Sequence, residues 1–106
     1  MKWCLSLFLL FSVSCFATSM SGPRKILSIG CHNTDSICYI AIEGSPVGPA
    51  GCNGTSIRWD SSTTPGKNHL SLFMAAYYAG KPVNLAILDT CFTSQPNFPT
   101  FGFSNM

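Results

Sequence analysis

The sequence predicts a mainly β fold with one α-helix, in which three strands precede the helix and two follow it. Three observations support this prediction. Five short segments rich in β-branched and aromatic residues are separated by turns containing Gly, Pro, Asn and Ser. One segment has the hydrophobic period of an amphipathic helix, with a start signal and a stop signal. Four cysteines outside the N-terminal segment provide the covalent links that a small core needs.

Residues 1–17 are expected to be a secretory signal peptide. Lys2 is followed by an almost wholly apolar run at 3–16 (WCLSLFLLFSVSCF), and small residues precede a cleavage point after Ala17. An alternative is that Cys15 is a lipoprotein acylation site, although Ser12 stands where such sites usually have leucine. Residues 18–106 are therefore expected to form a single domain of a secreted or periplasmic protein.

Residues 24–31 and 36–43 are expected to be the two strands of a hairpin, joined by the turn-rich segment HNTD. In the first strand, Leu27 and Ile29 should share a face. In the second, Tyr39 should lie on the face opposite the alternating apolar residues Cys38, Ile40 and Ile42. Cys31 and Cys38 flank the turn, and opposed residues of a hairpin approach within bridging distance, which favours a disulfide between them.

Residues 44–54 (GSPVGPAGCNG) are expected to form an exposed loop that carries Cys52. A short strand should follow at 55–60, with Ile57 and Trp59 on one face and Arg58 on the other. Four cysteines allow three pairings. We favour Cys31–Cys38 with Cys52–Cys91, because the second link would tie the loop to the last part of the domain and contribute about 4 kcal/mol.

The helix is expected to begin with Thr64 as N-cap and Pro65 in the first helical position, and to end at Gly80. Its buried stripe should be formed by Leu70, Phe73, Met74, Tyr77 and Tyr78, with one tyrosine hydroxyl reaching solvent or a partner. Strands are expected at 83–91 and, at an edge, 98–103. The resulting β-β-β-α-β-β order is that of an OB-fold, a five-stranded barrel with a helix at one end.

Composition excludes several function classes. The formal net charge of +2 is small and its basic residues are scattered, which argues against a nucleic-acid partner. No apolar run beyond the signal segment is long enough to span a membrane. A metal site at Cys31, His32 and Cys38 would lack the paired spacing and the fourth ligand of zinc sites, so no metal or cofactor is expected.

Catalysis is also not expected. His69 with Asp60 or Asp89 could resemble a base and its orienting group, but no nucleophile in a recognisable elbow accompanies them. Trp59 alternates with Ile57 and is expected in the core. Tyr39, on the opposite face of its strand from the core, is the candidate for stacking against a sugar ring.

One combination of residues resembles a known family. It begins with the loop cysteine Cys52 and a strand that ends in the aromatic-acid pair Trp59-Asp60. A Thr-x-Gly-Lys segment follows (Thr64, Gly66, Lys67), and the helix closes in Ala-x-x-Ala-Gly-Lys (Ala76, Ala79, Gly80, Lys81). The last part is a strand that contains Val83 and ends at Cys91. This pattern resembles small exported bacterial proteins related to the B subunits of subtilase-cytotoxin-like and pertussis-like AB5 toxins. The resemblance covers roughly residues 26–91.

The resemblance implies an OB-fold and a disulfide from the Cys52 loop to the strand ending at Cys91. In the toxin members it also implies glycan binding and a ring of five subunits; no sugar-contacting position is carried over. The sequence thus predicts an exported, non-catalytic binding module for a glycan or another exported protein, forming a pentameric ring in the toxin-like version. The alternative is a monomeric accessory or inhibitor protein that binds another protein.

Overall fold

The structure is a computed structural model that describes residues 18–106. The predicted signal peptide lies outside the described residues. The elements are strands and helices in the order β1 (Ser19–Met20), β2 (Ile26–Cys31), β3 (Ile37–Ile42), the 3₁₀-helix η1 (Ala50–Cys52), β4 (Ser56–Asp60), α2 (Thr64–Ala79), β5 (Asn84–Cys91) and β6 (Pro99–Asn105). The described part of the chain is therefore mainly β with one α-helix, as predicted.

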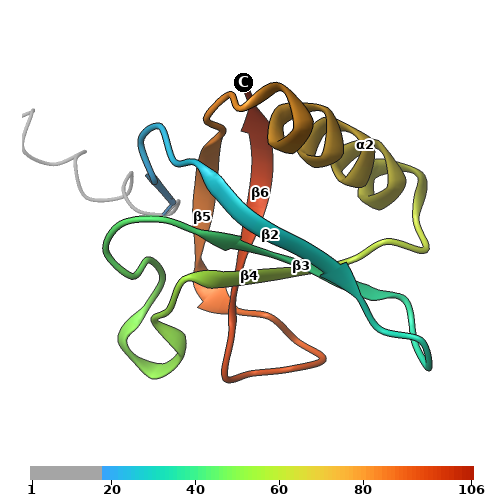
Figure 1. The fold of residues 1–106 in the computed structure, drawn as a ribbon. Helices are drawn as coiled ribbons and strands as arrows, with labels where there is room; N and C mark the ends of the chain where they lie inside the picture. The colour runs from blue at the N-terminus through green and yellow to red at the C-terminus, as the bar shows by residue number, and fades with distance from the viewer. Residues whose placement is uncertain (1–17) are drawn as a thin grey trace, which may run out of the picture.

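The strands form two antiparallel sheets of three, in the orders β1-β5-β6 and β2-β3-β4. In Figure 1 the strands β2, β3 and β4 run across β5 and β6, and α2 lies alongside β2. The sheets are connected where Arg24 and Val83 exchange two backbone hydrogen bonds of 2.8 Å.

The predicted OB-fold-like barrel of five strands is wrong, since the described strands form two separate sheets and do not close. An additional strand, β1, pairs Ser19 with Ile87 in a segment where no strand was predicted. Among the described residues, β4 and β6 have no backbone ladder that would close a barrel. Instead, the hydroxyl of Thr100 in β6 donates to the carbonyl oxygen of Arg58 in β4 at 2.7 Å. A side-chain hydrogen bond thus joins β4 to β6 where a closed barrel would have a backbone ladder.

The core centres on Trp59, which is 5% exposed, as its alternation with Ile57 predicted. Its ring centroid lies 5.1 Å from that of Phe73 in α2 and 5.7 Å from that of Phe101 in β6, both in edge-to-face geometry. The indole Nε1 donates to the carbonyl oxygen of Gly66 at 3.0 Å. One side chain therefore connects β4, the first turn of α2, and β6.

Helix α2 has the predicted end but a shifted start. Thr63, not Thr64, is the N-cap, since its Oγ1 accepts a hydrogen bond from the N–H of Gly66 at 3.0 Å. Pro65 is therefore the second helical residue. Gly80 adopts φ 70° at the C-cap, a left-handed conformation that favours glycine, as predicted.

The predicted buried stripe of α2 is wrong in its second half. Phe73 and Ala76 are buried, but Met74 is 44%, Tyr77 42% and Tyr78 81% exposed. The helix turns a narrow face, centred on Phe73, toward Trp59. The flank carrying Met74 and the tyrosines overhangs β2 instead of entering the core.

The predicted common face of Leu27 and Ile29 is also wrong. The register of β2 against β3 shifts between Ile26 and Ser28, which marks a bulge. The bulge leaves Ile26 buried while Leu27 is 58% exposed, and Ile29 packs against the core. An extra residue in one strand thus reverses the alternation that a regular strand would show.

Both favoured disulfides are present. Cys31–Cys38 joins opposed residues at the end of the β2–β3 hairpin, with 3.9 Å between the Cα atoms. Cys52–Cys91 joins η1 to the end of β5 across 39 residues of sequence, with 5.8 Å between the Cα atoms. The second link anchors the Gly- and Pro-rich loop to the β1-β5-β6 sheet.

We predict that Gly66→Ala will lower the free energy of unfolding by about 1–3 kcal/mol, as overpacking of a filled core does. A Cβ at this position would collide with the backbone of Asp60 and Ser61, which cannot move aside as a flexible side chain can. Gly51→Ala is the matched control, because a Cβ there meets no atom within 4 Å. Urea denaturation measures both, and equal losses in the two variants would contradict the prediction.

We predict that replacing Cys52 and Cys91 by alanine will destabilise the fold more than replacing Cys31 and Cys38. The chain-entropy relation gives about 4 kcal/mol for the longer loop and about 2.4 kcal/mol for the shorter one. Each pair contains one buried cysteine, Cys52 at 2% and Cys38 at 1% exposure, so the cavity effects are similar. Urea denaturation of the two double variants checks the order, and the reverse order would contradict it.

Candidate functional site

Tyr39 lies on the outer face of the β2-β3-β4 sheet, where the sequence placed it, and is half-buried. Its ring lies across the backbone of Gly30, the residue opposite it in β2. A Cβ at position 30 would collide with the tyrosine hydroxyl and ring. Glycine at this position therefore lets the aromatic ring lie flat against the sheet.

Arg58 lies opposite Tyr39 on the neighbouring strand β4. Its Cζ atom is 4.8 Å from the centroid of the Tyr39 ring and 3.6 Å from that of Phe98, both within the range of cation–π attraction. Its Nη1 donates to Gln95 Oε1 at 2.7 Å. The guanidinium thus holds the segment before β6 against the outer face of the sheet.

His32 completes this group. Its Nδ1 is 3.1 Å from Asp35 Oδ1, and its Nε2 is 3.4 Å from Arg58 Nη1. Since the guanidinium can only donate, the network assigns the proton to Nδ1 and leaves Nε2 as an acceptor. We call the group formed by His32, Tyr39, Arg58, Gln95 and Phe98 the Tyr39–Arg58 patch.

A polar hollow of about 340 Å³ adjoins the patch. It is lined by Asp35, Ser36, Ile37, Asp60, Ser94 and Gln95, so Gln95 belongs to both. Asp35, in turn, is the partner of His32. Tyr39 does not line this hollow, but Arg58, which contacts the Tyr39 ring, bonds to Gln95 in the lining.

The hollow is rich in hydrogen-bond acceptors. Asp60 Oδ1 accepts from the N–H and the hydroxyl of Ser62 at 2.8 and 2.7 Å. These bonds, the hydroxyl first, hold the pKa of Asp60 below its ordinary value, so the group is a carboxylate at neutral pH. Carboxylates, an amide and hydroxyls beside aromatic rings suit a ligand that carries several hydroxyl groups.

Sequence reasoning selected Tyr39 but missed its neighbours. Alternation placed Arg58 on the face opposite Trp59, and this was the signal that could have paired it with Tyr39 once the register of β3 and β4 was known. Phe98 was placed in the last strand, whereas the structure has it just before β6. Gln95 comes from a loop, and no sequence pattern pointed to it.

His69 does not lie in the patch. Its Nδ1 is 2.8 Å from Ser104 Oγ in β6, and its ring packs against Phe73 and Phe101. Asp60, its candidate orienting group, is engaged with Ser62 instead. His69 therefore joins α2 to β6.

The described residues contain neither a cluster of metal-binding side chains nor a helix that could span a membrane. Within 18–106, no group of three His, Cys, Asp or Glu side chains is arranged to hold a metal ion. No helix in that range is long and apolar enough to cross a membrane. The Cys31, His32, Cys38 combination, considered as a metal site from the sequence, contains a disulfide instead.

Comparisons of the chain with protein-family models, with curated proteins and with solved structures find no match. The resemblance to AB5 B subunits thus rests on the sequence motifs alone.

We predict that His69 makes the fold less stable in acid. Burial lowers the pKa of His69 below its ordinary value of 6.5, so the unfolded chain binds a proton more readily than the folded one. The contribution of neutral His69 to the free energy of unfolding is fully present above the pKa that His69 has in the unfolded chain. It is lost as the pH falls through the lower pKa that His69 has in the folded state. Urea denaturation at several pH values should show a decline below about pH 6.5 that is smaller in His69→Gln. The same slope in both proteins would contradict the assignment.

Proposed function

We propose that this chain is an exported, non-catalytic module that binds carbohydrate through the Tyr39–Arg58 patch and the adjoining polar hollow. The observation that supports it most directly is the combination of a half-buried aromatic ring on the outer face, fixed over Gly30 and beside Arg58, with a hollow lined by carboxylates and an amide. The two disulfides agree with export to a secreted or periplasmic location.

Each part of the site has a distinct role in this proposal. The solvent-exposed part of the Tyr39 ring offers apolar contact to the C–H side of a sugar ring. Asp35, Asp60 and Gln95 accept hydrogen bonds from hydroxyl groups in the hollow. Arg58 is largely a positioning residue, since its guanidinium is already held by two rings and by Gln95.

The toxin-like version of the proposal adds a homopentameric ring. The alternative is the monomeric accessory or inhibitor protein, which would bind another exported protein through the same outer face. Native mass spectrometry of the purified chain separates the two. A five-subunit species supports the ring, whereas a strict monomer removes the toxin-like version and leaves the monomeric forms.

We predict that the chain binds members of a glycan array and that Tyr39→Ala weakens the strongest interaction by about tenfold or more, the effect of losing an aromatic contact. Tyr39→Phe should retain most of the affinity, because stacking needs the ring and not the hydroxyl. Gln95→Ala should also weaken binding, since Gln95 belongs to both the patch and the hollow. Calorimetric titration with the strongest array ligand measures each affinity.

Phe103→Ala is the matched control for the array experiment. Phe103 is an exposed aromatic residue on β6 and takes no part in the patch or the hollow. Unchanged binding by this variant, with loss in Tyr39→Ala, supports the site. Absence of binding across the array, or equal losses in both variants, would overturn the carbohydrate proposal.

A further inference from the structure

Strand β2 has a free edge beside the helix. It ends the sheet β2-β3-β4, and among the described residues it pairs only with β3 along Ile26–Cys31. Just beyond the strand, the N–H of His32 donates to the carbonyl oxygen of Ile37, which makes these two a hydrogen-bonded pair. Antiparallel pairs alternate, so Gly30 and Ser28 also bond toward β3. The backbone N–H and C=O groups of Ile29 and Cys31 therefore point away from β3, toward the free edge.

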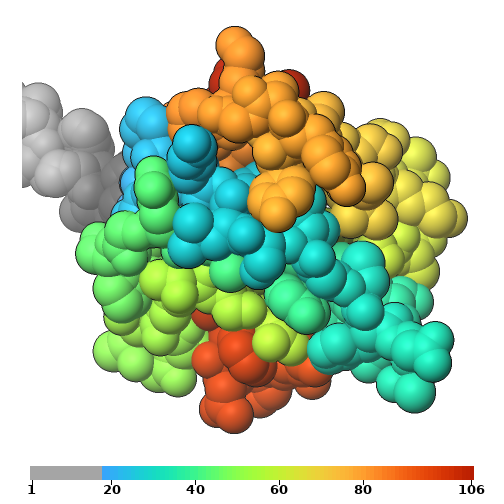
Figure 2. Space-filling view, viewed as in Figure 1, coloured from blue at the N-terminus to red at the C-terminus, as the bar shows by residue number. Residues whose placement is uncertain are grey.

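A groove follows this edge. It has a volume of about 390 Å³ and lies between β2 and α2, lined by Ser28, Ile29, Gly30, Cys31, Leu70, Met74, Tyr77 and Tyr78. Figure 2 shows the orange C-terminal half of the helix overhanging the cyan strand. Four consecutive residues of a strand cannot all reach one groove through their side chains, which alternate between faces. The groove is therefore lined partly by the backbone of β2.

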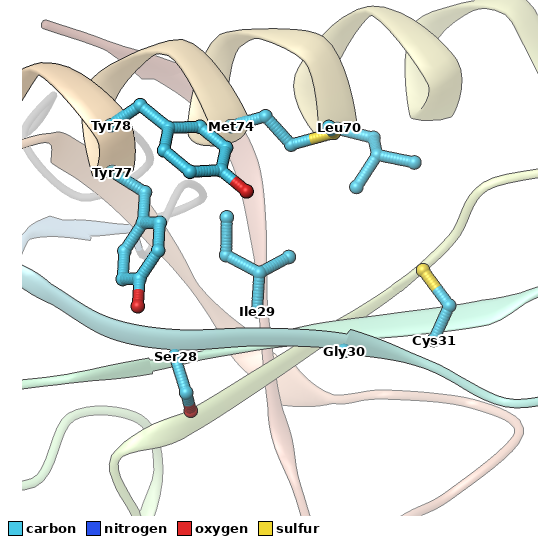
Figure 3. A pocket seen from close by; sticks show the side chains of 8 residues that line it. All are labelled: Ser28, Ile29, Gly30, Cys31, Leu70, Met74, Tyr77 and Tyr78. Carbon is cyan, nitrogen blue, oxygen red and sulfur yellow. The ribbon is translucent and has the colours of Figure 1, made fainter.

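The helix side of the groove is formed by apolar side chains and by two tyrosine rings that carry hydroxyl groups. In Figure 3 the ring of Tyr77 extends from α2 down to β2, and Ile29 extends from β2 toward the helix. Leu70 and Tyr78 lie above the strand, and Met74 runs along the helix between them. The rings of Tyr77 and Tyr78 contact each other at 5.4 Å between centroids. The lining contains no charged residue. The groove therefore favours a neutral occupant with apolar side chains.

We propose that this groove binds an extended peptide segment of another protein, which adds to β2 as a further strand beneath α2. Unpaired backbone donors and acceptors on a strand edge are matched by another strand, and apolar side chains on alternate residues of that strand would contact Met74 and Leu70. A lipid or a small apolar molecule would leave the backbone groups of Ile29 and Cys31 without partners. Of the groove residues, only Gly30 also touches the carbohydrate site, where it lies under Tyr39. The two ligands contact different side chains, so either proposal can fail alone.

The sequence of β2 contains none of the residues that commonly prevent a further strand from pairing with an edge. Strand edges that avoid pairing usually carry lysine, proline or inward-pointing charge, and ILSIGC contains none of these. The bulge after Ile26 lies before the groove, and residues 28–31 pair with β3 in regular register. The part of β2 that lines the groove is thus open to a further strand.

The test uses a peptide of about seven residues, in which valine alternates with threonine between terminal lysines, a length typical of a strand. Titration followed by NMR of the ¹⁵N-labelled protein should show slowed hydrogen exchange of the amides of Ile29 and Cys31. The amides of Gly30 and Ser28, which already bond to β3, should change little. The same peptide with every backbone nitrogen methylated keeps its side chains and should not bind.

Met74→Glu places a charge in the groove and should weaken peptide binding by about tenfold or more, because it removes an apolar contact. Phe103→Glu is the matched control, since it places the same charge on an exposed apolar residue outside the groove, and its affinity should equal that of the wild type. No binding of the peptide at millimolar concentration, or equal binding of the methylated peptide, would overturn the proposal. Concentration-dependent dimers that protect the same two amides without peptide would replace it with pairing between copies of this chain.

Discussion

The arrangement of the fold depends on the contacts of Trp59. Its ring meets Phe73 of the helix and Phe101 of β6, and its indole nitrogen is held by the first turn of the helix. The hydrogen bond requires the helix backbone to approach the end of β4 so closely that only glycine fits at position 66. The packing of α2 against β4 thus buries the Trp59 ring and also gives its N–H a hydrogen-bond acceptor.

The same contact determines which face of the helix remains outside the core. With Phe73 directed at Trp59, the next apolar flank of the helix lies over β2 and stays exposed. The groove beside β2 lies under this exposed flank.

Much of the fold could be predicted from local signals. Alternation identified Trp59 as core and Tyr39 as outward, and the capping pattern at Gly80 identified the end of the helix. Features set by contacts distant in sequence could not be predicted. The two-residue strand β1 exists because β5 offers it partners, and the bulge in β2 depends on its register with β3. The Tyr39–Arg58 patch could not be predicted for the same reason. It joins β3, β4 and a loop whose Gln95 comes 37 residues after Arg58.

The Cys31–Cys38 bridge has a consequence for how the chain acquires its fold. Its cysteines are seven residues apart, against 39 for the other bridge, so the entropy needed to bring them together is smaller. In oxidative folding the hairpin bridge should therefore close first. Once closed, it excludes the one-residue register slip that would exchange the two faces of β3. An early bridge would therefore fix the register that places Tyr39 opposite Gly30 before the rest of the domain has assembled.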